Sequence, residues 1–455
     1  MLLKHFYVEK IAHSSYLIGG NKTCAIVDPA RDVGKYIHAA KEEELDITHI
    51  LETHLHADFI SGHIDLAEKT GAAIYAPKNG NCEFEHVAVG EGSTFSIENI
   101  EFHVLDTPGH TPDCLVYLVN DLSRGDETVL AFTGDTLFVG DVGRPDLFPG
   151  RAEELAGKLY DNINNKIAKI TGDCIVLPAH GAGSLCGKAI GTMKLSTIGY
   201  ELKYNREILI KDKNDFIRSL TVGMPPAPDH FGRCSEINRK GPVPVESLPE
   251  IVPMTPAEFR EKMNDGKTVV LNTCDYAAFG GHHIPGSWHI DMSGNLSTFA
   301  GWVLPPEKDV LLVTDNQQQA EEAVVMLRRV GLDHAVGYLD GGTHAWVAAG
   351  YETGHVPQLS ANEVHEKLNG GGYTLLDVRT EDEYREKHVP GAVNILAMDL
   401  RTRYRELDTE GPLIAMCRTG RRSSLACSIL KQHNFRNICN ASGGITGYIA
   451  AGYLK

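Results

Sequence analysis

Three side chains that commonly bind metals occupy alternate positions just after an apolar run. His54, His56 and Asp58 lie in the segment ILETHLHADFISGH, residues 50–63. In extended backbone, residues two apart share a face, so these three side chains converge. Imidazole and carboxylate groups are common ligands of transition metals. The spacing therefore predicts a metal site where a strand gives way to a loop.

Three further candidate ligands follow other apolar runs. His110 stands in LDTPGHTPD, Asp135 in AFTGDTLF and His180 in VLPAHG, each after a predicted strand and turn. Binding sites of α/β proteins form at the ends of successive strands. We therefore expect these side chains to meet the first three at one site.

Together these motifs resemble the metallo-β-lactamase superfamily, whose pattern is T-H-x-H-x-D-H, then G-H-T, G-D and a late histidine. The hydrolases of this superfamily use two metals, and the final histidine of the first motif serves the second one. Phe59 stands at that position here and cannot bind a metal. His63, four residues further on, is interpreted as a bystander rather than a substitute ligand. The resemblance thus implies one metal, held by His54, His110 and Asp135.

Two histidines and a carboxylate that leave open positions suit Fe(II) and oxygen chemistry. Within the superfamily, the pattern looks like the persulfide dioxygenase branch, in which those three positions bind iron. The resemblance implies one Fe(II) per chain. It also implies that His56, Asp58 and His180 orient the ligands or a water molecule.

Three residues near the predicted site have two interpretations each. Arg144 and Asp146, in GDVGRPDLF, are expected near the mouth of the site, where Arg144 pairs with a substrate carboxylate. The alternative is a structural ion pair. Cys186, in AHGAGSLCGK, either accepts or relays sulfur or is a buried small residue, and the second is slightly favoured.

A second chemical motif is the loop MCRTGRRSS, which follows the apolar run PLIAM and precedes a helical segment. Such a loop directs backbone N–H groups inward at a helix N-terminus, and Arg418, Arg421 and Arg422 add positive charge. Both effects lower a thiol pKa and stabilise a bound anion. We therefore expect Cys417 to be a nucleophile that carries a persulfide, with the three arginines as an anion cradle.

The cysteine motif resembles the rhodanese sulfurtransferases. Supporting matches are the segment LLDVRTEDEYREKHVPGAVNI, with Asp377 and Arg379 as a structural pair, and the later Gly443-Gly444. Cysteine phosphatases place an arginine six residues after the cysteine, where this chain has Ser423. The shorter loop suits a sulfane sulfur better than a phosphate.

The last 200 residues or so contain an internal repeat, in which Pro285-Gly286 faces Pro390-Gly391. In the first copy Asp315 stands at the position of Cys417, and DNQQQA replaces the arginine-rich loop. The first copy therefore lacks both thiol and cationic cradle. We interpret it as an inactive rhodanese-like domain, kept as a spacer or docking surface.

The elements that must position these motifs alternate between strand and helix. Short β-rich runs from Ser14 to about Pro178 enclose helical stretches at residues 33–43 and 151–162, and each repeat copy has a parallel-sheet pattern. The fold class is α/β, a metallo-β-lactamase αββα sandwich followed by two rhodanese-like domains. The predicted parts are a metallo-β-lactamase-type domain at 1–222, an extended linker at 223–253, the inactive domain at 254–356 and the active domain at 357–455.

Composition limits the partners. A net charge of -17, from 60 acidic and 43 basic residues, disfavours nucleic acids and anionic membranes. Ten cysteines without a C-x-x-C pair indicate reduced thiols. Neither a signal peptide nor an apolar run of about 18 residues is found. We expect a cytoplasmic homo-oligomer that handles small molecules.

The leading hypothesis is a dioxygenase that oxidises a low-molecular-weight persulfide, of glutathione or coenzyme A, with dioxygen. Its product is sulfite, and a rhodanese step through Cys417 forms thiosulfate; the direction of sulfur flow stays open. The alternative is a thioester hydrolase of the glyoxalase II kind, which normally uses two metals and is disfavoured by Phe59. A sulfide or redox sensor is the third hypothesis, but the sequence offers no DNA-binding or signalling segment.

Overall fold

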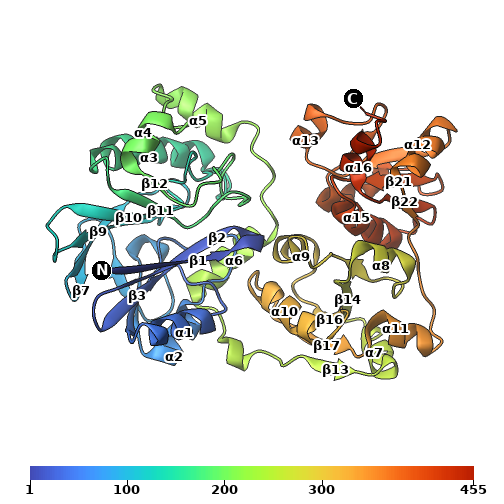
Figure 1. The fold of residues 1–455 in the computed structure, drawn as a ribbon, viewed down its shortest axis with the longest axis horizontal. Helices are drawn as coiled ribbons and strands as arrows, with labels where there is room; N and C mark the ends of the chain where they lie inside the picture. The colour runs from blue at the N-terminus through green and yellow to red at the C-terminus, as the bar shows by residue number, and fades with distance from the viewer. Residues whose placement is uncertain (455) are drawn as a thin grey trace. The chain divides into compact units, whose positions relative to one another are not determined.

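The computed structural model describes residues 1–454 and divides them into two compact units. The first contains residues 1–247 and 328–331, and the second contains residues 248–327 and those from 332 onward (Figure 1). None of the helices in residues 1–454 is both long enough and apolar enough to cross a membrane.

Two six-stranded sheets form the centre of the first unit. The first sheet has the order β1 (Leu2–Val8), β2 (His13–Gly19), β3 (Thr23–Val27), β4 (Asp46–Leu51), β5 (Ala73–Pro77) and β6 (Val87–Val89). The second has the order β12 (Ser196–Thr197), β11 (Ile175–Pro178), β10 (Thr128–Gly134), β9 (Leu115–Asp121), β8 (Ile100–Asp106) and β7 (Thr94–Ile97). Both sheets mix parallel and antiparallel pairs.

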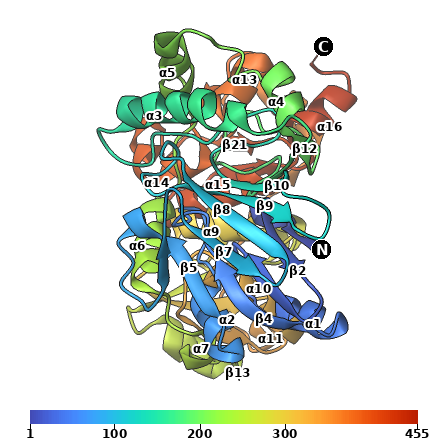
Figure 2. The same cartoon turned by 90° about the vertical axis from the view of Figure 1, so that its left-hand side faces the viewer.

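The two sheets pack face to face because alternate residues on their strands are apolar. Val27 and Leu51 of the first sheet share a buried cluster with Phe102 and Phe132 of the second. Helices cover the outer faces, as Figure 2 shows. They are α1 (Gly34–Glu42) and α2 (His63–Thr70) on the first sheet, and α3 (Ala152–Asn165), α4 (Ile198–Tyr204) and α5 (Lys213–Thr221) on the second. The predicted αββα sandwich is confirmed.

The segment 223–253 is not extended throughout, and that part of the prediction is wrong. It contains helix α6 (His230–Lys240), whose Phe231, Cys234 and Asn238 are buried. The amide of Asn238 donates to the carbonyls of His56 and Phe59, both at 2.8 Å. These long-range contacts stabilise a helix that the surrounding proline-rich composition conceals.

The second unit holds two copies of one parallel α/β fold, as the repeat predicts. The first copy has the strand order β13 (Val252–Met254), β17 (Ala335–Leu339), β16 (Asp309–Val313), β14 (Thr268–Asn272) and β15 (Trp288–His289). The second copy has the same order in β18 (Gln358–Leu359), β22 (Ile438–Ala441), β21 (Leu413–Met416), β19 (Thr374–Asp377) and β20 (Val393–Asn394). All neighbouring strands within each copy are parallel.

The helices of the copies also correspond. Both first helices begin with a capping box, at Thr255 with Glu258 and at Ser360 with Glu363. The first copy contains α7 (Pro256–Met263), α8 (Tyr276–Gly281), α9 (Leu296–Val303), α10 (Gln317–Arg328) and α11 (Gly342–Ala348). The second contains α12 (Ala361–Asn369), α13 (Glu381–Glu386), α14 (Leu400–Arg403), α15 (Arg421–Gln432) and α16 (Gly444–Ala450). Short 3₁₀ turns lie at Glu9–Ile11, Lys78–Gly80, Ile167–Lys169, Val245–Ser247, Ala397–Asp399 and Tyr404–Glu406.

Candidate metal centre and cysteine loop

Three of the predicted ligands converge beyond the ends of β4, β8 and β10. Asp135 Oδ2 lies 3.7 Å from His54 Nε2 and 3.3 Å from His110 Nε2, and all three side chains are fully buried. None of these three atoms has a hydrogen-bond partner within residues 1–454. Ligands that share one ion at about 2.1 Å lie roughly 3 to 3.5 Å apart. The spacing and the unpaired atoms therefore fit a metal ion.

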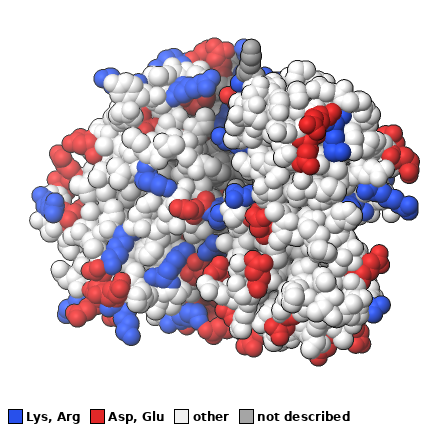
Figure 3. Space-filling view, turned by 45° about the vertical axis from the view of Figure 1, so that its right-hand side comes forward, with Lys and Arg blue, Asp and Glu red and all other residues white. Residues whose placement is uncertain are grey.

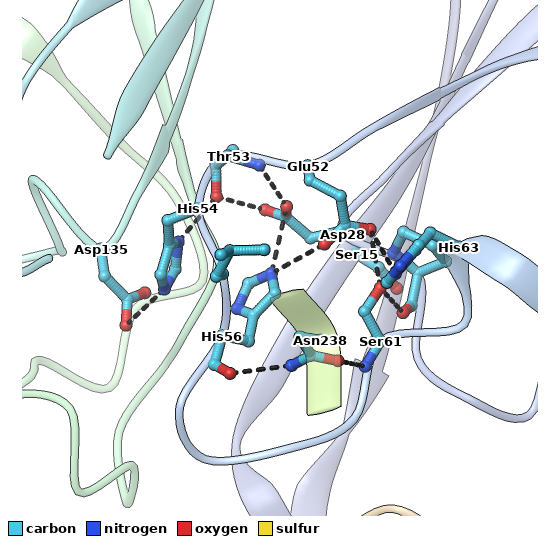
Figure 4. Close-up of polar contacts among 12 residues, drawn as sticks. Ser15, Asp28, Glu52, Thr53, His54, His56, Ser61, His63, Asp135 and Asn238 are labelled. Carbon is cyan, nitrogen blue, oxygen red and sulfur yellow. Dashed lines mark hydrogen bonds and ion pairs between the residues drawn. The ribbon is translucent and has the colours of Figure 1, made fainter. Parts of the chain in front are cut away.

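The other ring nitrogens of these histidines are held by the protein. His110 Nδ1 lies 2.7 Å from the carbonyl of Arg144, so Nδ1 carries the hydrogen, and His54 Nδ1 lies 3.0 Å from Thr53 Oγ1 (Figure 4). Burial lowers the pKa of both imidazoles. Their Nε2 lone pairs are thus available to a metal.

Asp135 is held by a chain of two further residues. His180 Nδ1 lies 2.8 Å from Asp135 Oδ1, and His180 Nε2 lies 2.8 Å from Asp58 Oδ2. Burial disfavours the charged forms of both Asp135 and His180. Nevertheless, the histidines around Asp135 lower the pKa of its carboxyl, and the two carboxylates raise the pKa of His180 well above its ordinary value. His180 contacts the candidate ligand Asp135, and Asp58 contacts His180. The orienting role of both stays a prediction.

His56 points away from the other candidate ligands. Its Nε2 lies 3.2 Å from Asp28 Oδ1 and 3.8 Å from Glu52 Oε2. Asp28 also accepts from the backbone N–H and the hydroxyl of Thr53, at 2.7 and 2.9 Å, and Thr53 in turn contacts His54. Figure 4 shows this buried network beside the candidate metal ligands. It fixes the loop that carries His54.

Asp28 and Glu52 are absent from the sequence-predicted site. Asp28 directly follows the apolar strand β3, in the same way that the predicted ligands follow their strands. That position is the signal from which it could have been found. Glu52 lies within the first motif but between apolar neighbours, and only the fold reveals its contact with His56.

Phe59 and His63 supply no ligand to the candidate centre. The Phe59 ring is fully buried, with its centroid 4.4 Å from that of His56. His63 begins α2, and its Nδ1 lies 3.7 Å from Glu52 Oε1. Neither side chain belongs to the group formed by His54, His110 and Asp135.

Cys186 lies beside the candidate centre but is fully buried. Its sulfur gathers with Asp58 and His180, their ligand atoms all within 4.8 Å of one another. His180 offers this group no free lone pair, since both ring nitrogens face carboxylates. Burial, reinforced by Asp58 and Asp135, raises the pKa of the Cys186 thiol well above its ordinary value. The structure favours a buried, protonated thiol over a sulfur relay.

Arg144 and Asp146 form an ion pair inside the protein, so the expected contact of Arg144 with a substrate carboxylate is wrong. The Arg144 side chain is 1% exposed, and its Nε and Nη2 donate to Asp146 at 2.6 and 2.8 Å. The remaining donors reach the carbonyls of Leu185 and Pro225. Every nitrogen of the guanidinium is engaged because three segments distant in sequence meet there.

We expect Arg144→Met to lower the free energy of unfolding of the first unit by about 3 kcal/mol, since it leaves Asp146 and two carbonyls without their donor. Chemical denaturation followed by fluorescence measures the change. The control is Arg218→Met, because that side chain is 71% exposed and pairs with the exposed Asp215. An Arg144 variant no less stable than the control would contradict the structural role.

The cysteine loop connects β21 to α15 and encloses the predicted nucleophile. Cys417 is 1% exposed, and its Sγ accepts from the N–H of Gly420 at 3.1 Å and the hydroxyl of Ser423 at 3.3 Å. Gly420 has φ +104°, a value that favours glycine. The side-chain amide of Asn440 donates a hydrogen bond to the Gly420 carbonyl at 3.1 Å. The loop thus places two donors on the sulfur, as a thiolate or persulfide requires.

The predicted arginine cradle needs correction, because two of its members are paired. Arg422 forms a two-pronged ion pair with Glu383 at 2.6 and 2.7 Å. Arg421 Nε lies 3.5 Å from Asp291 Oδ2. Arg418 is exposed. The carboxylates of Glu383 and Asp291 reduce the positive charge that the sequence alone predicts around the thiol.

The Glu383 and Arg422 pair predicts an acid-sensitive contribution to stability. Burial opposes the charge of Glu383, but Arg422 lowers its pKa to about 2, below the ordinary 4.5. A lowered folded-state pKa stabilises the fold above the ordinary value, and this contribution disappears as pH falls toward 2. We expect Glu383→Gln to lower stability by about 1 kcal/mol at neutral pH and by much less near pH 2.

Thermal unfolding of both proteins at the two pH values tests this expectation. Glu381→Gln is the control, since Glu381 lies on the same helix but is 68% exposed in its pair with Arg385. A Glu383→Gln difference that stays constant with pH would contradict the expectation.

The corresponding loop of the first copy has different chemistry. Asp315 follows β16 at the rim of a cavity of about 450 Å³, together with Cys274, His282 and His344. Among residues 1–454, no lysine or arginine lines this cavity. Burial and Asp315 raise the pKa of the Cys274 thiol. The cavity therefore offers no cationic loop for a thiolate, and the inactivity of this copy stays a prediction.

Comparison with known proteins finds a matching family for each half of the chain. A model of the metallo-beta-lactamase superfamily matches residues 9–180, and a rhodanese-like domain model matches residues 255–349 and 360–451. The chain is 28% identical over 183 residues to the mitochondrial persulfide dioxygenase of Mus musculus, covering 40% of this chain and 68% of that protein. It is 30% identical over 250 residues to a hydroxyacylglutathione hydrolase of Pseudoalteromonas translucida, covering 53% and 84%.

A solved structure described as a metallo-beta-lactamase from Staphylococcus aureus has 32% identity and a TM-score of 0.67, covering 74% of this chain and 98% of that one. Fold and site together define an αββα protein with a metal-binding group of two histidines and an aspartate, followed by tandem parallel α/β domains. The chain belongs to the metallo-β-lactamase superfamily, and it joins this domain, whose relatives include persulfide dioxygenases, to two rhodanese-like domains.

Proposed function

We propose that this protein is a non-haem iron persulfide dioxygenase coupled to a sulfurtransferase, with one Fe(II) per chain. A low-molecular-weight persulfide, of glutathione or coenzyme A, is oxidised according to RSSH + O₂ + H₂O → RSH + SO₃²⁻ + 2H⁺. The similarity to a persulfide dioxygenase supports this reaction. Its physiological role is the oxidation or detoxification of sulfide.

One observation carries the proposal. The unpaired atoms His54 Nε2, His110 Nε2 and Asp135 Oδ2 converge, while Phe59 stands where binuclear hydrolases have a ligand of their second metal. Two imidazoles and one carboxylate leave coordination positions open, an arrangement typical of non-haem Fe(II) oxygenases.

Fe(II) bound there would supply the Lewis acidity and redox chemistry that activate dioxygen. The protein's own contribution is orientation and exclusion of water. Thr53 and the Arg144 carbonyl direct the imidazoles, and His180 occupies Asp135 Oδ1, which leaves Oδ2 for the ion. A buried apolar cluster that contains Phe138 lies beside His180 and keeps water away from the site. The cluster consists of Ala57, Phe138, Cys186 and Phe231.

The second reaction takes place at Cys417. A persulfide on this residue gives its outer sulfur to sulfite, Cys–S–S⁻ + SO₃²⁻ → Cys–S⁻ + S₂O₃²⁻. The sulfur–sulfur bond of the enzyme breaks, a new one forms in thiosulfate, and the thiolate leaves. The donors from Gly420 and Ser423 stabilise that thiolate.

The distribution of charge on the surface supports small-molecule partners. Acidic and basic side chains are interspersed on the face in Figure 3, which has no broad basic area of the kind that binds nucleic acid. The net charge of -17 supports the same view. The cytoplasmic location and the homo-oligomeric state stay predictions.

The deciding experiment compares two substrates on protein produced without added metal. We expect anaerobically iron-loaded protein to consume oxygen with glutathione persulfide and to form sulfite, which the Cys417 step converts to thiosulfate. Zinc-loaded protein should not hydrolyse S-lactoylglutathione. Hydrolysis with zinc, combined with no oxygen uptake with iron, would reject the dioxygenase in favour of the thioester hydrolase. Metal analysis of the same samples gives the number of ions per chain.

A further inference from the structure

The first copy places an aromatic ring directly on the cysteine loop of the second copy. Tyr276 begins α8. Two atoms of its ring lie 3.2 Å from the point where a Cβ on Gly420 would stand. The Tyr276 hydroxyl lies 3.3 Å from Ser442 Oγ. Ser442 directly precedes the Gly443-Gly444 turn, so Tyr276 contacts the loop and its neighbouring turn at once.

Gly420 is the residue through which this contact reaches the thiol. Its N–H donates to Cys417 Sγ, its carbonyl is held by Asn440, and its missing side chain makes room for the Tyr276 ring. The turn is tied to the same loop, because the N–H of Ile445 donates to the Cys417 carbonyl at 2.8 Å. A shift of Gly420 into the space of the ring would take its N–H away from the sulfur.

The first copy also contributes a buried carboxylate. Asp291 follows β15, and its side chain is 4% exposed. Its Oδ1 accepts from the N–H of Ser293, whereas Oδ2 has no hydrogen-bond partner in the described chain and lies 3.5 Å from Arg421 Nε. The Arg421 side chain is 47% exposed and can be reached by solutes. The Arg421 guanidinium is therefore shared between Asp291 and the solvent.

A further bond anchors the copies along α15. The N–H of His289 in β15 donates to Ser428 Oγ at 3.0 Å, and both residues are buried. The contacts with Gly420, Arg421 and Ser428 thus fall on the cysteine loop and the helix that follows it. Other contacts between the copies lie outside this segment, such as the bond from Arg401 to the Trp302 carbonyl at 2.7 Å. Three first-copy residues therefore touch the segment that carries Cys417.

We propose that the first rhodanese-like copy completes the Cys417 site. Tyr276 holds Gly420 so that its N–H stays on the sulfur, and Asp291 weakens the binding of anionic sulfur donors by pairing with Arg421. Both are positioning residues, since neither touches the sulfur. The proposal rests on the sulfurtransferase function and explains why a copy without a thiol is retained.

The first test measures the pH dependence of Cys417 alkylation by iodoacetamide in the full-length protein, followed on the Cys417 peptide by mass spectrometry. The charged groups around the thiol are Arg418, Arg421 and Arg422 with their partners Glu383 and Asp291, and the Tyr276 variants leave them all in place. We expect Tyr276→Ala to raise the midpoint of alkylation by about one pH unit, because a hydrogen bond to the thiolate is weakened. Tyr276→Phe keeps the ring on Gly420 and should match the wild type.

Identical profiles for the wild type and Tyr276→Ala would overturn the role of Tyr276. If Tyr276→Ala does not fold, Tyr276→Leu serves as the truncated variant. This readout needs no turnover. A wild type that transfers no sulfur would therefore reject the sulfurtransferase function, while the alkylation profiles would still decide whether Tyr276 positions Gly420.

The second test separates Asp291 from Tyr276 by steady-state kinetics with thiosulfate as donor and cyanide as acceptor. We expect Asp291→Asn to lower KM for thiosulfate about threefold, because one ion pair no longer competes with the donor. Its kcat should stay within about twofold. Asp309→Asn, which removes a first-copy carboxylate paired with Lys262, is the control. An unchanged or raised KM in Asp291→Asn would overturn the role of Asp291.

Discussion

Replacing Asp135 by asparagine should leave the protein unable to hold iron and lower oxygen uptake by at least about 100-fold. The substitution preserves shape but removes the only charge among the three candidate ligands. It also removes the carboxylate that pairs with His180 Nδ1 at 2.8 Å. Iron per chain, measured by mass spectrometry after anaerobic loading and desalting, reports on binding independently of turnover.

The matched control is Asp161→Asn, an aspartate of the same unit that is 51% exposed in its pair with Lys213. It should bind iron and consume oxygen like the wild type. Thermal unfolding of the metal-free proteins checks that the Asp135 variant is folded. An Asp135→Asn protein with wild-type iron content would show that the ion is held elsewhere, and the proposed centre would be wrong.

The position of the candidate centre could be predicted because each ligand follows an apolar strand. His54, His110 and Asp135 come after β4, β8 and β10, and the ends of these strands meet at one side of the sandwich. Strand ends are readable from apolar runs followed by turn residues. The same logic placed Cys417 between β21 and α15.

The direction of a side chain is harder to predict than its position. His56 stands two residues after His54 and alternation would place it on the same face, yet it binds Asp28 and Glu52 instead. The chain between them is a loop, not a strand, so the period of two no longer holds. Asp28 lies 28 residues upstream of His56 in a different strand connection, and no local pattern links the two.

Contacts between distant segments account for the other corrections. Arg144 is satisfied by the carbonyls of Leu185 and Pro225, which only the tertiary fold brings near. The repeat shows that Tyr276 lies at the start of a helix that corresponds to α13 of the second copy. Aligning the two copies does not show how one packs against the other. The pairing of Arg421 with the Asp291 carboxylate is therefore visible only in the structure.

Replacing Cys417 by serine should abolish sulfur transfer, with a loss on the order of 10³-fold or more, because serine forms no persulfide. The thiosulfate–cyanide assay measures this loss against the uncatalysed rate. With glutathione persulfide and oxygen, the iron-loaded variant should consume oxygen within about twofold of the wild type, since the iron ligands are untouched. Its product should be sulfite instead of thiosulfate.

Cys439→Ser is the control, because it removes a thiol from the same domain outside the cysteine loop and should keep thiosulfate formation. Wild-type transfer by Cys417→Ser would contradict the nucleophilic role. The variant also decides the direction of sulfur flow. If Cys417 delivers persulfide to the iron, Cys417→Ser should lose oxygen uptake with thiosulfate as sulfur donor while keeping it with glutathione persulfide. If Cys417 acts only after sulfite is formed, thiosulfate should support no oxygen uptake in either protein.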